Sequence, residues 1–261
     1  MSVIVGIVKH VKSYFDTALP HVLAHRGLHT EVPENTLEAF RLALAAGATH
    51  IETDAHASAD GVAVLVHDPT IVVGGRTIVV ADLTAAELAA LDLGAGEGIP
   101  SLESVLVALP EARFNIDVKI TEAVGPVAHA IEIANASQRV LIASFKAARR
   151  TGTLRRLTGV ATSSSATTSL LAVLLATVGL TRLGARALAR VDAVQLPTTM
   201  FKIPVFTPRF IRMCHRAGVV VHAWTINEPD QMRKLLERGL DGIVTDRADL
   251  ASDVVAQLKV A

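Results

Sequence analysis

The stretch HIETDAHASADGVAVLVHDPT, which spans His50–Thr70, reads as a β-strand, a tight turn and a returning strand. Side chains two positions apart on a strand point the same way, so Glu52 and Asp54 lie on one face and can share a hard cation through their oxygens. The Asp-Gly pair at 60–61, between two alternating apolar runs, predicts a hairpin turn. The returning strand then carries His67 back beside the two carboxylates.

Two other short strands end in residues of the same kind. His25 follows an apolar run in LAHRG (23–27), and FNIDVK (114–119) places Asp117 and Lys119 two positions apart on one face. A lone histidine at a strand end is usually structural, but charged groups are rarely buried without a partner, so their repetition at strand ends indicates a site. Two histidines, three carboxylates and neighbouring cations suit hydrolysis of a phosphodiester on a metal ion.

The whole chain alternates strand-like runs with helical stretches, and no linker rich in glycine, serine or proline separates them. Eight parallel strands are expected, at 21–25, 49–54, 114–119, 139–144, 159–163, 191–196, 219–224 and 241–246. Eight alternations in 261 residues predict a single domain, 1–261, folded as a closed (β/α)8 TIM barrel, a fold of about 250 residues. In such barrels the chemistry takes place at the carboxyl ends of the strands. The side chains that fall there are His25, Glu52, Asp54, Asp117, Lys119 and Trp224.

Helix signals lie between the strands. Asn35 is the expected N-cap of a helix that runs to Gly47, with Glu38 reaching back to form a capping box. Further helices are expected at 84–91, 102–109, 122–136, 208–217 and 229–238, the last followed by Gly239 as its terminator. The glycine-rich segment from about 69 to 100 is too long for a simple connection. It predicts a small insertion after the second strand, placed where it can roof the site and help to choose the substrate.

Composition excludes some classes of partner. The 25 basic and 25 acidic residues leave no net charge, so no overall field favours nucleic acid or a strongly acidic partner. The single cysteine, Cys214, excludes an internal disulfide and is compatible with a reducing compartment. The apolar run before Lys9 is too short for a secretory signal, and a cytoplasmic enzyme is therefore expected.

Two apolar segments leave alternatives open. Residues 3–15 have apolar positions at helical spacing and predict a short amphipathic helix that closes the bottom of the barrel; the alternative is peripheral contact with a membrane surface. Segment 161–180 has an apolar core, 170–180, far shorter than the ~20 residues of a membrane span. We expect a buried helix there, and the alternative is an apolar wall that meets a lipid-like substrate.

Motifs along nearly the whole chain match those of a known family. They are HRG (25–27), PENT (33–36), IETD (51–54), DG (60–61), HD (67–68), DLTAAEL (82–88), IPSLESVL (99–106), NIDVK (115–119), AWTIN (223–227) and GLDGIVTDR (239–247). By these motifs the chain resembles glycerophosphodiester phosphodiesterases. Each motif is weak alone, but together they are highly specific.

The resemblance implies a TIM barrel that binds one divalent cation, Mg²⁺ or Ca²⁺, and hydrolyses a glycerophosphodiester to glycerol 3-phosphate and an alcohol. By the match, His25 and His67 are the acid/base pair. The remaining matched positions are the metal ligands Glu52, Asp54 and Asp117 and the phosphate-binding residues Arg26 and Lys119. Trp224 offers a flat apolar surface for the glycerol carbons, so we include it as a substrate-binding residue.

Two departures from the family pattern bear on the site. The third ligand position is usually glutamate in this family, and here it is Asp117, whose shorter side chain should shift the metal or add a water ligand. The stretch after HDPT reads VVGGRTIVV in place of the usual polar run, which changes the substrate contacts expected from that loop.

The preferred substrate is a small glycerophosphodiester such as glycerophosphocholine. The main alternative is a phospholipase D-like enzyme on the same barrel, acting on lysophospholipids or sphingomyelin, which the apolar core 170–180 favours. A phosphoinositide phospholipase C-like activity fits the E-x-D and NIDVK motifs poorly. A non-catalytic protein that binds metal or phosphate is expected to have lost a histidine or ligand, and none is missing from the motifs.

Overall fold

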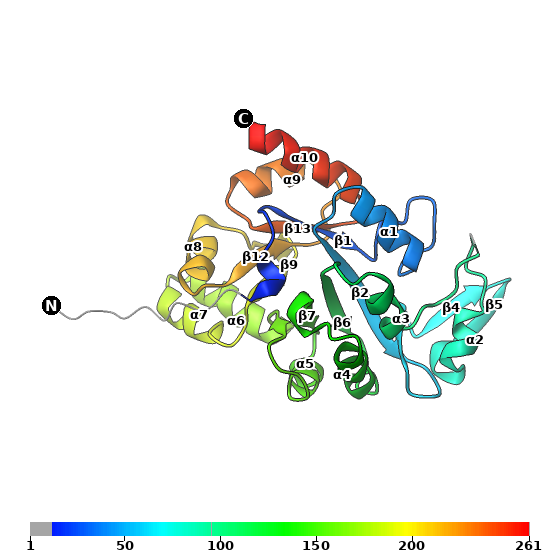
Figure 1. Ribbon diagram of the computed structural model, residues 1–261. Helices are drawn as coiled ribbons and strands as arrows, with labels where there is room; N and C mark the ends of the chain where they lie inside the picture. The colour runs from blue at the N-terminus through cyan, green and yellow to red at the C-terminus, as the bar shows by residue number, and fades with distance from the viewer. Residues whose placement is uncertain (1–11, 95, 261) are drawn as a thin grey trace.

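The computed structural model describes residues 12–94 and 96–260, and Figure 1 shows them as a barrel of strands with helices on its outside. In this part of the chain eight parallel strands pair side by side. Their order is β8 (Ala161–Thr162), β7 (Val140–Ala143), β6 (Phe114–Val118), β2 (His50–Ala57), β1 (His21–His25), β13 (Gly242–Thr245), β12 (Val220–Ala223) and β9 (Ala193–Leu196). All eight lie within or overlap the predicted strands.

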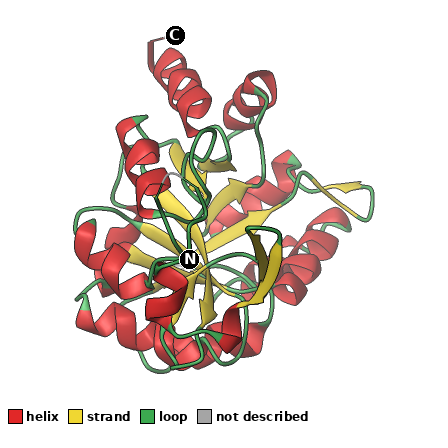
Figure 2. Cartoon of the chain, turned by 90° about the vertical axis from the view of Figure 1, so that its right-hand side faces the viewer, coloured by secondary structure: helices red, strands yellow, loops and turns green. Residues whose placement is uncertain are grey.

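The two ends of this strand order meet. Ser163, just after β8, forms a parallel bridge with Ala193 at the start of β9. The backbone N–H of Asp192 donates to the carbonyl of Thr162 at 2.8 Å, and that of Ser164 donates to the carbonyl of Ala193 at 2.9 Å. Figure 2 shows the strands gathered in the middle of the molecule with the helices around them. The predicted (β/α)8 TIM barrel is confirmed.

Helices occupy the predicted connections. Their bounds are α1 (Leu37–Ala45), α2 (Ala85–Ala89), α3 (Leu102–Ala108), α4 (Val124–Ile133), α5 (Ala147–Leu154), α6 (Ala166–Thr177), α7 (Thr181–Ala187), α8 (Pro208–Arg216), α9 (Pro229–Glu237) and α10 (Ala248–Val260). Short 3-10 helices are η1 (Ser13–Phe15), η2 (Val80–Asp82) and η3 (Ser137–Arg139). Gly239 has φ +98°, a backbone conformation that side chains disfavour, as expected for the residue that terminates α9.

The expected N-cap of α1 was wrong by one residue. Thr36 caps the helix, and its side chain accepts a hydrogen bond from the N–H of Ala39 at 3.3 Å. Asn35 instead adopts φ +57° and turns its side chain toward β2. Its Oδ1 accepts from the hydroxyl of Thr53 at 2.7 Å, and its Nδ2 donates to Asp54 at 3.4 Å. An amide that bonds a buried strand cannot also cap the helix beside it.

The excursion after β2 has its own small core. Strand β3 (Ala63–Leu65) folds back antiparallel on β2, and β4 (Thr70–Val73) pairs with β5 (Arg76–Val79) around Gly74 and Gly75. In Figure 1 this part, coloured cyan, lies to one side of the barrel. Its buried apolar residues are Val64, Val66, Val80, Leu88 and Ile99. The insertion is therefore packed on itself and fixes the position of the chain that follows β3.

The amino end of the barrel is closed by η1. Tyr14 and Phe15 are buried there against Leu141, Ala161 and Ala193, which lie at or near the starts of β7, β8 and β9. The greater part of the helix predicted at 3–15, residues 3–11, lies outside the described residues. Within that segment, Ser13–Phe15 closes the amino end of the barrel, as a 3-10 turn and not as part of an α-helix.

Helix α6 is only partly buried, although segment 161–180 predicted a buried helix. Ala172, Val173 and Ala176 pack inward, whereas Leu171 and Leu174 are exposed. The helix has apolar residues on both faces, so Leu171 and Leu174 on its outer face are exposed to water. No helix in the described chain is long and apolar enough to cross a membrane.

Candidate active site

The first part of the site follows β1. Arg26 adopts φ +58° and Gly27 φ +89°, so the chain turns sharply where the strand ends. A Cβ on Gly27 would lie 2.7 Å from the carbonyl carbon of Ala39, so only glycine allows α1 to pack this closely. The turn leaves His25 at the strand end and brings Arg26 over β2. There the backbone N–H of Arg26 donates to the backbone carbonyl of Glu52 at 2.9 Å.

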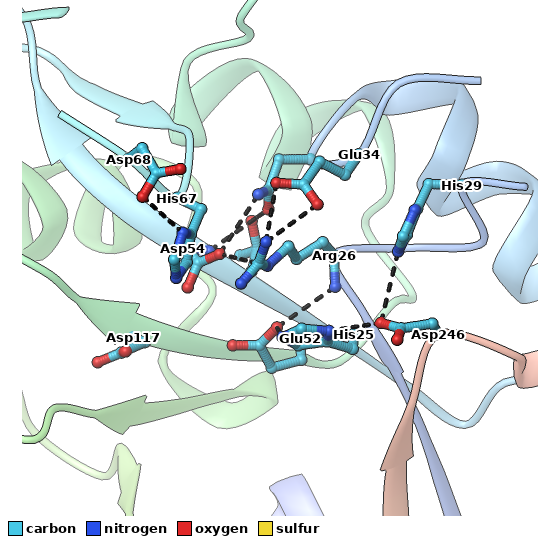
Figure 3. A network of polar contacts seen from close by, with 12 residues as sticks. His25, Arg26, His29, Glu34, Glu52, Asp54, His67, Asp68, Asp117 and Asp246 are labelled. Carbon is cyan, nitrogen blue, oxygen red and sulfur yellow. Dashed lines mark hydrogen bonds and ion pairs between the residues drawn. The ribbon is translucent and has the colours of Figure 1, made fainter. Parts of the chain in front are cut away.

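Strands β2 and β6 supply the carboxylates. Asp54 pairs in register with Asp117, which places the two side chains next to each other across the sheet. The Nζ of Lys119 lies 2.7 Å from Asp54 and 2.8 Å from Asp117. Arg26 lies 3.0 Å from the other oxygen of Asp54 through its Nε, and its Nη1 donates to both oxygens of Glu34. Figure 3 shows Asp54 and Glu34 beside Arg26 and Glu52 beside His25, with Asp117 further to the left.

Burial and neighbouring charges shift the pKa values of these carboxylates in different directions. It raises the pKa of Glu52 well above the ordinary value, and the charges of Asp54 and Asp117 raise it further. Burial also raises the pKa of Asp117, although Lys119 opposes the shift. Burial acts the same way on Asp54, but there Lys119 and Arg26 outweigh it and lower the pKa. The site thus concentrates more negative charge than its neighbouring cations neutralise, a state that a bound cation relieves.

The donor set suits a hard divalent cation. Glu52, Asp54 and Asp117 offer carboxylate oxygens only, the ligand type that Mg²⁺ and Ca²⁺ prefer. Within residues 12–94 and 96–260, no three histidine, cysteine or acidic side chains already converge closely enough to coordinate an ion. In their place, the ammonium group of Lys119 bridges two of the carboxylates. The residues therefore fit a cation chemically, and a cation bound there would share Asp54 and Asp117 with Lys119.

His25 is held by a carboxylate that sequence reasoning left unassigned. Its Nδ1 donates to Asp246 at 2.6 Å, while its Nε2 lies 3.9 Å from Glu52 (Figure 3). Asp246 also accepts from Nδ2 of Asn227 at 2.7 Å and lies 3.5 Å from Nε2 of His29. The hydrogen bonds from His25 and then His29 hold the pKa of Asp246 far below the ordinary value. Asp246 therefore stays ionised and fixes which nitrogen of His25 faces the cavity.

His67 reaches the site from the insertion. Its Nδ1 donates to Asp68 at 3.0 Å, and its backbone carbonyl accepts from Nε2 of His56 at 3.1 Å. Figure 3 places His67 beside Asp54, on the side of the site away from His25. Two histidines thus flank the carboxylates from opposite sides.

All of the predicted site residues border one cavity of about 370 Å³. They are His25, Arg26, Glu52, Asp54, His67, Asp117, Lys119 and Trp224. The rest of the lining is uncharged and comes from later strands and loops: Ala143, Ser144, Phe145, Ser163, Ser164, Ala166, Ser169, Gln195, Leu196, Pro197, Met200, Thr225 and Val244, with Asn115 from β6. Trp224 forms an edge contact with Phe145, with ring centroids 6.1 Å apart. The cavity therefore has a charged half and a neutral half.

Several polar residues of the site escaped sequence reasoning. Asp246 directly follows the apolar strand β13, the same position that marks the other site residues, so its signal was present. Glu34 and Asn35 lie in the PENT motif, where only contacts across the fold reveal that they bind Arg26 and Asp54. His29 had no signal, because it approaches Asp246 from a loop. His222 on β12 is buried and bonds His21 at 3.1 Å.

Comparison with known proteins identifies the family of this chain. Residues 25–250 match the model of the Glycerophosphoryl diester phosphodiesterase family. The chain belongs to this family. As a glycerophosphodiester phosphodiesterase it is a phosphoric diester hydrolase, and the non-catalytic alternative is excluded. The resemblance inferred from the motifs is confirmed.

Other members of the glycerophosphodiester phosphodiesterase family are similar over most of their length. A probable glycerophosphodiester phosphodiesterase 2 of Mycobacterium tuberculosis is 45% identical over 240 residues, 89% of each chain. A glycerophosphodiester phosphodiesterase of Caldanaerobacter subterraneus is 31% identical over 250 residues, 90% of this chain and 97% of the relative.

Solved structures share the fold. A putative glycerophosphoryl diester phosphodiesterase from Silicibacter pomeroyi has a TM-score of 0.77 and 23% identity, and covers 95% of this chain and 98% of its own. A phosphodiesterase of Oleispira antarctica, solved with the product sn-glycerol-3-phosphate, has a TM-score of 0.71 and 23% identity, and covers 91% and 97%.

Proposed function

We propose that this protein hydrolyses glycerophosphodiesters to glycerol 3-phosphate and an alcohol on one divalent cation, with His25 and His67 as the acid/base pair. The observation that carries the proposal is the arrangement of the cavity wall, where two histidines flank three buried carboxylates and two cations. The relatives named above as glycerophosphodiester phosphodiesterases support the substrate class.

With Glu34 and Asp246, which bind Arg26 and His25, left out of the count, the charges of the groups that would meet the cation and the phosphodiester balance. Three carboxylates and one phosphodiester carry four negative charges, and a divalent cation with Arg26 and Lys119 carries four positive charges. Such neutrality is what a poorly solvated barrel mouth can hold. Glu52, Asp54 and Asp117 would hold the cation, which when bound acts as a Lewis acid on the phosphoryl oxygens. Arg26 and Lys119 reduce the repulsion that a phosphodiester anion exerts on a nucleophile.

The two histidines divide the proton transfers. One imidazole accepts a proton from the attacking group while the other donates a proton to the leaving alkoxide, and only histidine does both readily near neutral pH. Asp246 accepts a hydrogen bond from Nδ1–H of His25, which leaves Nε2 directed toward Glu52 and the reacting groups. The attacking group is water or the substrate's own glycerol 2-hydroxyl. In the second route the 2-hydroxyl expels the alcohol and forms a cyclic phosphate, which water then opens to glycerol 3-phosphate.

The experiment is a panel of glycerophosphodiesters, beginning with glycerophosphocholine, assayed with Mg²⁺, with Ca²⁺ and with EDTA. We expect release of glycerol 3-phosphate with either cation, loss of activity in EDTA, and recovery when the cation is restored. Asp54→Asn should weaken cation binding measured by calorimetry, whereas Asp253→Asn, an exposed carboxylate on α10, should not. Full turnover in excess EDTA after dialysis would exclude the cation.

Phospholipase D-like hydrolysis of lysophospholipids is the second candidate, and the neutral half of the cavity favours it. Ala166 and Ser169 of α6 line that half, and Leu171 and Leu174 lie exposed further along the same helix. An acyl chain leaving the cavity would follow these leucines. A folded Leu171→Ser or Leu174→Ser variant that loses lysophospholipid turnover and keeps glycerophosphodiester turnover would support this candidate; an unchanged ratio of the two rates would exclude it.

A further inference from the structure

The neutral net charge hides a strong division of charge along the chain. Residues 139–216 hold 13 of the 25 lysines and arginines but only one of the 25 acidic residues, Asp192. The remainder of the chain consequently holds 12 basic and 24 acidic residues. We call residues 139–216, which run from η3 to α8, the basic sector. The net charge of the whole chain, which is zero, does not reveal this local positive charge.

The cations of the basic sector face water without acidic partners. Ten of the 13 are exposed, and in the described residues none of these ten forms an ion pair with a carboxylate. Elsewhere on the surface, Arg41 pairs with Glu38 and Arg247 with Asp249. Helices α6, α7 and α8 pack against one another, so the exposed arginines of α7 (Arg182, Arg186) and α8 (Arg209, Arg212, Arg216) lie on the same wall of the barrel as α6, which is uncharged (Figure 1). An unpaired basic wall of this kind attracts a negatively charged partner.

An apolar stripe crosses the same wall. Leu171, Leu174 and Val178 recur at helical spacing along α6 and are 50%, 44% and 68% exposed. Leu180 and Leu183 extend the apolar surface onto α7. Exposed apolar groups gathered in one place mark an interaction surface rather than ordinary solvent-facing helix. The partner must therefore offer both negative charge and apolar contact.

The basic sector also borders the mouth of the cavity. It supplies most of the neutral half of the lining, including Phe145 and Met200. Phe145 is 60% exposed, and Phe201, next to Met200, is 81% exposed. Exposed aromatic rings, like exposed leucines and arginines, are side chains that enter the boundary between lipid headgroups and acyl chains.

We propose that the basic sector is a docking surface for an anionic lipid bilayer. Phosphate headgroups match its unpaired arginines, and the acyl boundary matches the leucine stripe and the two phenylalanines. Nucleic acid would satisfy the arginines but leave the leucines against a charged backbone, so it matches only half of the surface. Docking in this way brings the neutral side of the cavity mouth to the lipid surface and does not depend on the chemistry inside the cavity.

The test is vesicle co-sedimentation of the full chain. One set of vesicles is phosphatidylcholine alone, and in the other about a third of the lipid is phosphatidylglycerol. We expect binding to the anionic vesicles, with an affinity that falls as salt is raised, and little binding to the neutral ones. Arg182→Glu with Arg186→Glu on α7 should lower the partition coefficient by about 25-fold or more, since each cation near such a surface contributes roughly fivefold.

The matched control reverses an equally spaced pair outside the basic sector. Lys234→Glu with Arg238→Glu changes two exposed cations at the end of α9 and should leave vesicle binding within about twofold of wild type. Val178→Ser with Leu183→Ser removes apolar contact without changing charge and should weaken binding by about 10-fold. These residues do not line the cavity, so turnover of a soluble glycerophosphodiester should be unchanged in every variant.

Three outcomes would overturn the proposal. In the first, the wild-type protein does not bind anionic vesicles. In the second, the α9 control variant loses as much vesicle binding as the α7 variant. In the third, the α7 variant binds anionic vesicles as well as wild type does. Wild type that binds single-stranded nucleic acid at physiological salt but not vesicles would assign the surface to another class of partner. Because soluble turnover is measured in parallel, a failed active-site proposal and a failed docking proposal give different results.

Discussion

His21 and His25 stand at opposite ends of the same strand, β1, in opposite surroundings. His25 donates to the ionised Asp246, lies near Glu52 and borders the cavity. His21 is 1% exposed and bonds another buried histidine, His222, at 3.1 Å. Strand β2 repeats the arrangement, with His50 buried at its start and the carboxylates further along it. The two ends of the barrel thus use one residue type for different purposes.

The difference comes from what surrounds each imidazole. Burial lowers the pKa of His21 to about 4 and that of His50 to about 3, so both remain neutral at physiological pH. At the carboxyl end, His25 contacts an ionised carboxylate and borders an open cavity. A histidine performs acid/base chemistry only where its charged form has a partner and its substrate has access. The amino end lacks both and uses histidine as a packed, hydrogen-bonded core residue.

The largest expected effect separates the two ends directly. His25→Ala and His67→Ala should each lower kcat by about 10²-fold or more, because a positioned acid or base contributes 10²–10⁴. His21→Ala and His222→Ala should leave kcat within a few-fold and instead lower the free energy of unfolding by about 2–4 kcal/mol. The measurements are steady-state kinetics and urea unfolding of all four variants. Near-normal turnover in either of the first pair removes that histidine from the mechanism.

The second prediction concerns stability against pH. Because the pKa of folded His21 is about 4 and that of unfolded histidine is about 6.5, the unfolded chain binds more protons as the pH falls below 6.5. The free energy of unfolding should therefore decrease as the pH is lowered through this window, by on the order of 2 kcal/mol for His21 between pH 7 and pH 5. His222, buried beside it, should act in the same direction. Of the charged groups facing His21, Asp241 opposes the effect and Arg113 favours it.

Urea unfolding at pH 7, 6 and 5 measures this slope. A His222→Phe variant, which removes one buried imidazole and keeps an aromatic ring, should show a shallower dependence than wild type. A slope that does not change in this variant would show that the amino-end histidines are not the groups that titrate.

The third prediction tests how the carboxyl end orients its histidine. Asp246→Asn removes the carboxylate charge that holds Nδ1–H of His25 by a hydrogen bond. The variant should lower kcat by about 10-fold with little change in KM. Asp249→Asn, three residues later and paired with Arg247 away from the cavity lining, is the matched control and should be neutral. If Asp246→Asn raises KM and leaves kcat unchanged, Asp246 contributes to binding rather than to orientation.

The smallest expected effect lies in the neutral half of the cavity. Trp224→Ala should raise KM for a glycerophosphodiester by about fivefold, because the glycerol carbons lose a flat apolar surface, with kcat nearly unchanged. Trp224→Phe should recover most of the loss. A fall in kcat alone would show that Trp224 positions the reacting groups and does not merely bind substrate.

Much of the carboxyl end was predictable because local rules determine it. Alternation along the strand places Glu52 and Asp54 on one face, and the Asp-Gly turn at 60–61 returns the chain so that His67 follows β3. Parallel strands end at the same edge of a barrel, so residues after apolar runs meet without further information. These regularities act over a few residues, and the sequence displays them directly.

The sequence by itself determined the barrel, its strand ends and the set of charged side chains that border the cavity. Only the tertiary structure decided that Asp246 supports His25 across 221 positions of sequence, that Asn35 bonds Asp54 instead of capping α1, and that the exposed arginines of α7 and α8 share one wall with the exposed leucines of α6. The physical reason is that pairing between distant groups depends on where closure of the barrel places them. Residue periodicity specifies which face a side chain occupies, but not which distant group it meets there.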